Sequence, residues 1–156
     1  MIPNYVYVLL VLLLLLLIPV GGLFLLARQS NGMDPQSVGR DKLSEGPEKP
    51  NWVSSSATIE SHQIEAIAFT GDPEVAWEKI QEAVDELGKT TTITSEPDYL
   101  HIECRTPLLG FVDDLELLLK PDDQRIEVRS ASRAGHSDVG ANRKRVEKLR
   151  VLFGEG

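Results

Sequence analysis

Hydrophobic and polar positions divide the chain into three parts of different character. Residues 1–27 carry no charged side chain, and 5–26 are almost wholly apolar. Residues 28–56 mix Gly, Pro, Ser and charged residues without an apolar period, which is typical of a flexible segment. From 57 to 156, apolar residues recur with the periods of strands and helices. We therefore predict a transmembrane anchor at 1–27, a flexible linker at 28–56 and a globular α+β domain at 57–156.

The apolar run Tyr5–Leu26 has the length of a membrane-spanning helix. As a helix it would extend roughly 33 Å, which matches the hydrocarbon core of a bilayer. A cleaved signal peptide is the alternative, but the run is too long, lacks a preceding basic region and ends in a poor cleavage site. We therefore expect a single-pass membrane protein held by Tyr5–Leu26. The basic residues that follow, Arg28, Arg40 and Lys42, favour a globular domain on the cytoplasmic side.

Alternation and turn signals predict five strands in the domain, at 62–69, 90–95, 99–105, 111–120 and 125–131. Asp72 and Pro73 are typical of a helix start, and an apolar face continues from there to Leu87. A last helix is expected at about 139–153. The order β-α-β-β-β-β-α predicts an α+β fold: an antiparallel sheet of about five strands with two helices on one face, preceded by the N-terminal transmembrane helix.

The turn at 121–124 fixes how the two longest strands pair. It places four pairs opposite each other: Leu119 and Ile126, Leu117 and Val128, Glu116 and Arg129, and Asp113 and Ser132. Asp113 has the phase of the leucines, so its carboxylate needs a partner on the core side. Arg143 borders the buried stripe of the last helix. We therefore predict a structural clasp in which Asp113, with Asp114 beside it, holds Arg143.

Charge is unevenly distributed along a chain whose net charge is −8. Residues 51–128 hold 17 acidic and 5 basic side chains, whereas 129–153 hold 2 acidic and 7 basic ones. The acidic part argues against nucleic acid as a partner, and the basic part is expected to pair with it internally. The single cysteine, Cys104, excludes an intradomain disulfide and a cysteine-based metal site, and its phase predicts a buried, inert thiol.

Small, polar and charged residues concentrate in the segment 130–142, SASRAGHSDVGAN. Ser137 or Asp138 can cap the last helix, whose N-terminus together with nearby arginines would hold a phosphate, a carboxylate or a lipid headgroup. The candidate ligand-binding residues are Arg129, Ser130, Ser132, Arg133, Ser137, Asp138, Asn142 and Arg143. The alternative is a structured loop in which these side chains satisfy one another.

Catalytic residue types occur without a recognisable catalytic arrangement. A hydrolase would need His136 to approach Asp113 or Asp114, and adjacency in sequence does not provide this. No HExxH, Gly-rich phosphate loop or metal-ligand spacing occurs, so we expect no metal and no cofactor. The remaining histidines, His62 and His101, are interpreted as part of a solvated face.

Three stretches of the domain resemble a known family. They are PNWVSSSA at 50–57, DYLHIECRTPLLGFVDDLELL at 98–118 and RSASRAGHSDVGANRKRVEKLR at 129–150. They are similar to family 1499 of domains of unknown function, whose members often carry membrane or export segments. The family typically has Cys at the position of Trp52, so any role of that thiol is absent here. The resemblance implies no established activity.

Three functional hypotheses follow. The first is a non-enzymatic, membrane-tethered module that binds an anionic small molecule, a lipid headgroup or a membrane-protein partner. The second is a hydrolase-like enzyme that uses Asp113 or Asp114 with His136. The third is a structural subunit of a membrane complex, for which Leu118 on the outer face of its strand is an indication. We favour the first, because no nucleophile–base pair is visible.

Overall fold

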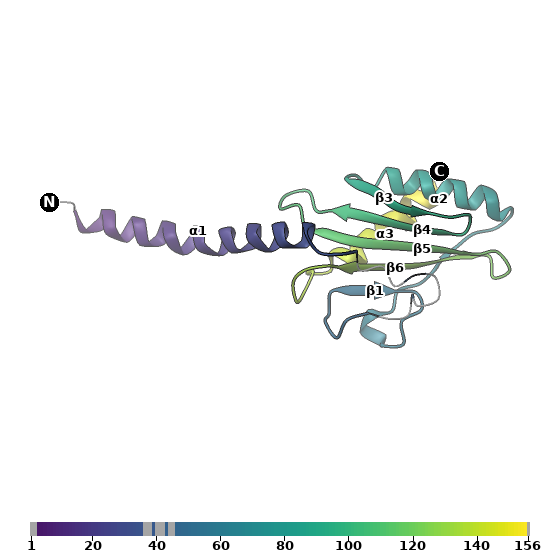
Figure 1. Cartoon of the computed structure of the whole chain (residues 1–156), viewed down its shortest axis with the longest axis horizontal. Coiled ribbons are helices and arrows are strands. Elements are labelled where there is room, and N and C mark those ends of the chain that lie inside the picture. The colour runs from purple at the N-terminus through teal and green to yellow at the C-terminus, as the bar shows by residue number, and fades with distance from the viewer. Residues whose placement is uncertain (1–2, 36–38, 40–42, 44–45, 156) are drawn as a thin grey trace.

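The computed structural model describes residues 3–35, 39, 43 and 46–155 (Figure 1). A long helix, α1 (Asn4–Asn31), projects from one end of a domain built on a single sheet. Its most apolar window has a mean hydropathy of 3.1, so α1 is long and apolar enough to span a membrane. Most of its side chains are exposed, and Ala27 and Ser30 near its end are buried.

The sheet is antiparallel and has six strands in the order β1-β6-β5-β4-β3, with β2 also paired to β6. The strands are β1 (Trp52–Ser54), β2 (Ile67–Ala68), β3 (Thr90–Ser95), β4 (Tyr99–Arg105), β5 (Val112–Lys120) and β6 (Arg125–Ser132). The predicted α+β fold is confirmed, and the order of elements from β2 onward is the predicted one. Strand β1 is additional.

Two helices, α2 (Pro73–Asp85) and α3 (Ala141–Glu155), pack on one face of this sheet. The start of α2 is as predicted, because Asp72 Oδ1 accepts a hydrogen bond from the Glu74 N–H at 2.8 Å. The core between helices and sheet includes Trp77 and Ile80 of α2, Ile102 and Leu117 of the sheet, and Val146, Leu149 and Phe153 of α3. Burying each such side chain contributes about 1.5–3 kcal/mol.

Strands β5 and β6 pair in the predicted register. All four expected pairs are observed: Leu119 with Ile126, Leu117 with Val128, Glu116 with Arg129, and Asp113 with Ser132. The agreement follows from the side-chain period of two, because a slip by one residue would move every leucine of β5 to the other face.

The first predicted strand, 62–69, is wrong in extent. Only Ile67–Ala68 forms a strand, and Glu60–His62 forms a short 3-10 helix. The reason is contact with β1. The His62 ring stacks on Trp52 with 4.3 Å between ring centroids, and His62 Nδ1 lies 2.9 Å from the Trp52 carbonyl oxygen. These tertiary contacts outweigh the local alternation.

The segment predicted as a flexible linker, 28–56, contains fixed structure at both ends. Helix α1 continues to Asn31, and Trp52–Ser54 is a strand in the sheet. Between them, Leu43 is only 2% exposed, and the Gly39 N–H donates to Glu116 Oε1 at 3.2 Å. The few apolar residues of this segment are too widely spaced to produce a period, so their burial left no pattern in the sequence. The predicted linker residues 36–38, 40–42 and 44–45 lie outside the described residues.

The sheet face opposite the helices is buried rather than solvated. Leu43 packs there against Tyr99 and Leu118, which are 5% and 3% exposed. The interpretation of His62 and His101 as parts of a solvated face is therefore wrong, since both are buried. The burial of Leu118 under Leu43 also removes the indication of an exposed apolar patch on this face.

Candidate functional site

Helix α1 contacts the domain directly. Ser30 is fully buried, and its Oγ accepts a hydrogen bond from the Val112 N–H at 3.0 Å. Asn31 Nδ2 donates to the Gly110 carbonyl at 3.2 Å, and Arg105 donates to Asn31 Oδ1. These contacts attach α1 to the start of β5, at one end of the sheet (Figure 1).

Three connecting segments lie at this end. Strands β4 and β6 run toward α1 and β5 runs away from it, so the loops 106–111 and 133–140 both emerge beside α1 (Figure 1). Helix α2 ends here as well, which places 87–89 in the same region. We call these three segments, with the first turn of α3, the α1-proximal end. Any ligand that binds here would also lie beside α1.

The loop tips at the α1-proximal end expose large apolar side chains. Leu108 is 87% exposed and Val139 is 85% exposed, more than any large apolar residue described in α1. Val139 also has φ +53, a left-handed conformation that costs a β-branched residue about 1–2 kcal/mol. Ser137 Oγ and Asp138 Oδ1 hold this turn by accepting from the N–H groups of Val139 and Gly140 at 3.2 and 3.0 Å. Neither exposed side chain supports the core.

An apolar pocket of about 310 Å³ lies between α1 and the two loops. Its apolar walls are Leu23 and Leu26 of α1 and Leu109, Phe111, Ala134 and Val139 of the loops. Two carboxylates also line it, but both are occupied: Asp113 pairs with Arg145, and Asp138 accepts backbone N–H groups. We refer to this space as the apolar pocket.

A second pocket, of about 410 Å³, opens next to the first and is strongly basic. Among the described residues that line it, none is acidic and five are cationic: Lys89, Arg105, Lys144, Arg145 and Lys148. Lys148 Nζ donates to the carbonyls of Glu86 and Leu87. Among the described residues, the ammonium groups of Lys89 and Lys144 have no hydrogen-bond or ion-pair partner. We refer to this space as the basic pocket, and its free charges favour an anion.

The predicted ligand residues do not form one cluster, because β6 directs alternate side chains to opposite faces. Ser130, Ser132 and Asn142 lie on the helix side and bond to one another at 2.7 and 2.9 Å. Arg129 and Arg133 lie on the opposite face. Arg129 donates to Glu116 at 2.8 Å, and Arg133 is 6% exposed.

At the start of α3, Asp138 Oδ2 accepts the Asn142 N–H at 2.8 Å. The predicted cap by Asp138 is thus observed, and the chain's own carboxylate occupies the helix N-terminus. Ser137, the alternative cap, is exposed and bonds to the Val139 N–H. The free cations of this end are therefore the lysines of the basic pocket rather than the predicted arginines.

The predicted clasp between β5 and the last helix exists, but Arg143 is the wrong partner for Asp113. Arg145 Nη2 lies 2.5 Å from Asp113 Oδ2, whereas Arg143 donates to the carbonyls of Ser61 and Gln63. Arg145 is two residues further along α3 and nearer the sheet. Burial is the largest single influence and lowers the pKa of Arg145, but the charge of Asp113, its hydrogen bond to Arg145 and the further contributions of Cys104 and Asp138 together raise that pKa above its ordinary value.

Asp114, predicted beside this clasp, belongs to a separate buried network on the opposite face. Arg133 binds it through Nε and Nη2 at 2.9 and 2.7 Å, and His101 Nε2 lies 2.7 Å from the same carboxylate. A hydrogen bond from Arg133 to Asp114 raises the pKa of the arginine. Arg133 also reaches Glu103 at 2.8 Å and donates to the Met33 carbonyl at 3.3 Å. The network thus ties the segment after α1 to the sheet.

The catalytic arrangement considered above does not form among the described residues. His136 is exposed and makes no hydrogen bond there, while Asp113 and Asp114 are buried and paired with other side chains. Cys104 is 4% exposed, and burial raises the pKa of its thiol to about 11, as expected for an unreactive cysteine. Within the described part of the chain, no group of three His, Cys, Asp or Glu side chains could hold a metal ion.

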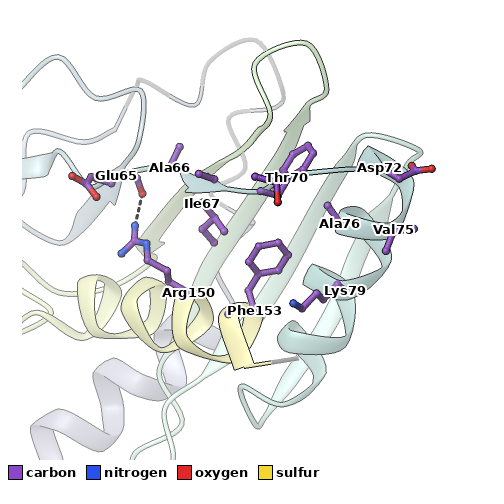
Figure 2. Close-up of a pocket in the computed structure, with 13 residues that line it drawn as sticks. Glu65, Ala66, Ile67, Thr70, Asp72, Val75, Ala76, Lys79, Arg150 and Phe153 are labelled. Atoms are coloured by element: carbon purple, nitrogen blue, oxygen red, sulfur yellow. Dashed lines mark hydrogen bonds between the residues drawn. The ribbon is translucent and has the colours of Figure 1, made fainter.

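A wider groove of about 670 Å³ lies near the start of α2, away from α1 (Figure 2). Phe153 points into it, and Arg150 donates to the Glu65 carbonyl at 2.6 Å (Figure 2). Acidic and basic side chains line it in equal number, Glu65 and Asp72 against Lys79 and Arg150. This groove therefore has no preference for an anion.

Sequence reasoning missed the lysines of the basic pocket. Lys144 and Lys148 are four residues apart in α3, a spacing that places them on one helix face and was available as a signal. Lys89 comes from a turn 55 residues earlier in the chain. Nothing in the sequence indicates that this turn meets α3.

Comparisons with known proteins give a family and no activity. A family model described as a protein of unknown function, DUF1499, matches residues 42–153. No curated protein and no solved structure matches the chain.

Proposed function

The chain belongs to the DUF1499 family of unknown function, and we propose that it is a single-pass membrane protein whose domain binds an anionic lipid headgroup. In this proposal the domain is a non-enzymatic module. Helix α1 anchors it, and its α1-proximal end rests on the bilayer.

The basic pocket is the observation that carries the proposal. Two of its ammonium groups, those of Lys89 and Lys144, have no partner among the described residues, and no carboxylate lines the space. Two of the five cations, Arg105 and Arg145, are paired with Glu103 and Asp113, so the free positive charge of the pocket comes from its lysines. Each basic side chain near an anionic membrane surface contributes about 1 kcal/mol of attraction.

The position of α1 supports a lipid as the source of the anion. If Tyr5–Leu26 spans the bilayer, the contacts of Ser30 and Asn31 hold the domain within about two helical turns of the membrane surface. Leu108 and Val139 would then reach the interface, where exposed apolar side chains are favourable. The basic residues after the run favour the cytoplasmic side, whose leaflet is the anionic one.

Thermal stabilisation of the full-length protein in a neutral detergent tests this proposal. We expect dihexanoyl phosphatidylglycerol to raise the melting temperature and dihexanoyl phosphatidylcholine to have little effect. Replacing Lys89→Gln and Lys144→Gln together should abolish the difference. The matched control Lys79→Gln with Lys120→Gln removes the same charge far from α1 and should retain it. Equal stabilisation by both lipids would refute the proposal.

A second candidate, a subunit of a membrane-protein complex, is favoured by the groove in Figure 2. Val75 at its edge is 61% exposed, and β2 beside it is a short strand paired on one side only. Purification in mild detergent should then recover a stoichiometric partner, and a Val75→Asp variant should lose it. Recovery of the chain alone would count against this candidate.

A further inference from the structure

We propose that the apolar pocket and the basic pocket form one site for a single anionic lipid molecule. Its acyl chain would occupy the apolar pocket and its phosphate the basic pocket. This inference rests on the proposed function and deepens it, because it names one bound molecule instead of a charged surface.

The two pockets adjoin each other. Thr106 of the loop and Ala141, the first residue of α3, line both of them, and the ion pair between Asp113 and Arg145 joins one lining to the other. The two side chains at this boundary are small. A molecule that occupies both pockets would cross this boundary beside Thr106 and Ala141.

The lining changes character across this boundary in the way that a lipid requires. On one side lie Leu109, Phe111 and Val139, and on the other side lie the ammonium groups of Lys89 and Lys144. Such a junction of an apolar and a cationic wall complements an amphiphile with a negative headgroup. A free phosphate would leave the apolar pocket empty, and a neutral hydrocarbon would leave the lysines unpaired.

The apolar pocket also fits part of an acyl chain in size and position. A methylene group is close in volume to a water molecule, about 30 Å³, so the 310 Å³ pocket holds roughly ten carbons. Leu23 and Leu26 of α1 form one of its walls. If α1 spans the bilayer, a lipid can enter the pocket directly from the membrane. The rest of its acyl chain would remain among the neighbouring lipids.

The acidic residues near the site do not oppose an anion. Asp113 is neutralised by Arg145 at 2.5 Å, and Asp138 accepts the N–H groups of Gly140 and Asn142 at 3.0 and 2.8 Å. Arg145 also lines the basic pocket, but its charge is balanced by Asp113, so the free positive charge there comes from Lys89 and Lys144. The charge available to a ligand is thus positive.

Photocrosslinking of the full-length protein in nanodiscs tests this inference. The probe is phosphatidylglycerol with a diazirine in the acyl chain, at one fifth of a phosphatidylcholine bilayer, and the matched probe has a phosphatidylcholine headgroup. We expect the anionic probe to label the peptide that contains Ser132 and Ala134 at least tenfold more than the matched probe does. Both probes should label the part of α1 before Leu23 equally, because that part contacts only the bulk lipid.

Two variants distinguish binding of one lipid in the joined pockets from general attraction to an anionic membrane surface. Ala134→Phe fills the apolar pocket and should suppress the domain labelling while thermal stabilisation by short-chain phosphatidylglycerol persists. Lys89→Gln with Lys144→Gln leaves the walls of the apolar pocket intact and should also suppress the labelling of the domain. Labelling confined to α1, with headgroup preference in thermal stabilisation retained, would overturn this inference alone. If thermal stabilisation of the wild-type protein showed no preference for the anionic headgroup, the proposed function itself would be refuted.

Discussion

At the residue scale, the charged side chains fall into two groups with different roles. Asp113 with Arg145 and Asp114 with Arg133 are buried pairs whose members neutralise each other. Lys89 and Lys144, by contrast, are exposed and lack such partners among the described residues. The net charge of a segment does not reveal this division. It depends on which carboxylates the fold brings within hydrogen-bond distance of each cation.

The clasp between β5 and α3 makes a clear prediction for stability. Arg145→Met leaves the Asp113 carboxylate buried without a partner and should lower the free energy of unfolding by about 3–5 kcal/mol. Arg143→Met removes only hydrogen bonds to two carbonyls from a half-buried side chain, so its effect should stay near 1 kcal/mol. Denaturant unfolding in detergent, followed by Trp fluorescence, measures both. Equal effects would mean that Asp113 does not depend on Arg145.

Cys104 should be almost unreactive in the folded protein. With a pKa of about 11 instead of 9.0, its thiolate population at pH 8 is about 100-fold lower, and burial slows access further. Reaction with Ellman's reagent should accelerate at least 100-fold on unfolding in denaturant. In the window from about pH 9 to 11 the unfolded thiol loses its proton while the folded one retains it. Stability should therefore fall with rising pH there, and less so in Cys104→Ala.

Val139 should show a trade-off between stability and lipid binding. Asn tolerates the left-handed conformation better than a β-branched residue, so Val139→Asn should stabilise the lipid-free protein by about 1 kcal/mol. The same change removes an exposed apolar tip and a wall of the apolar pocket, so labelling of the domain by the anionic diazirine probe should decrease. A melting curve of the lipid-free protein measures the first effect, and the crosslinking yield in nanodiscs measures the second. A variant that binds lipid unchanged would show that Val139 has no part in the site.

At the scale of the elements, the most consequential feature is the junction between α1 and β5. The buried Ser30 hydroxyl accepts the Val112 N–H, and Arg133 reaches the Met33 carbonyl just beyond the helix. We predict from these contacts that the apolar helix and the sheet move as one body at this end, with the orientation of the domain relative to α1 set by the contacts rather than by a free chain.

Spin labels at Gln29→Cys on α1 and Glu82→Cys on α2 test this rigid junction. Cys104 stays unlabelled because it is buried. Double electron–electron resonance should give one distance with a width of a few ångström, since each labelled helix is joined to the same sheet by buried contacts. A flexible linker of the predicted length would span roughly 30 Å and broaden the distribution accordingly. A broad distance distribution would instead support the predicted flexible linker between α1 and the domain.

The sequence predicted the elements with local periodicity and missed those that depend on distant contacts. Strands β4, β5 and β6 were found because their alternation is regular and the turn at 121–124 sets their register. Strand β1 has three residues and is stabilised by pairing with β6, so no local signal marks it. The prediction of Arg143 as the partner of Asp113 is wrong for the same reason, because only the rotation of α3 against the sheet shows that Arg145 reaches this carboxylate.

The candidate site was less predictable than the fold. The segment 130–142 was recognised as unusual, and it does contribute walls to the apolar pocket. The basic pocket, however, is formed by three segments that lie far apart in the chain and meet only because α2, β4 and α3 reach the same end of the sheet. In the sequence, its lysines look like ordinary surface residues, and only the topology shows that they lie together.

At the scale of the whole molecule, apolar, basic and anchoring features share one end. The far end carries instead a groove with balanced charge, near the start of α2 (Figure 2). This polarity suits a protein that binds a membrane lipid through the α1-proximal end and presents the other end to solvent or to a partner. In the proposed function, the domain lies on the cytoplasmic side of the membrane.

Native mass spectrometry of the full-length protein, released from membranes in a mild detergent, tests the central claim most directly. We predict that one anionic phospholipid remains bound per chain. Its occupancy should fall at least tenfold in Lys89→Gln with Lys144→Gln and stay unchanged in Lys79→Gln with Lys120→Gln. Retention of zwitterionic and anionic lipids to the same extent in all three proteins would contradict the account.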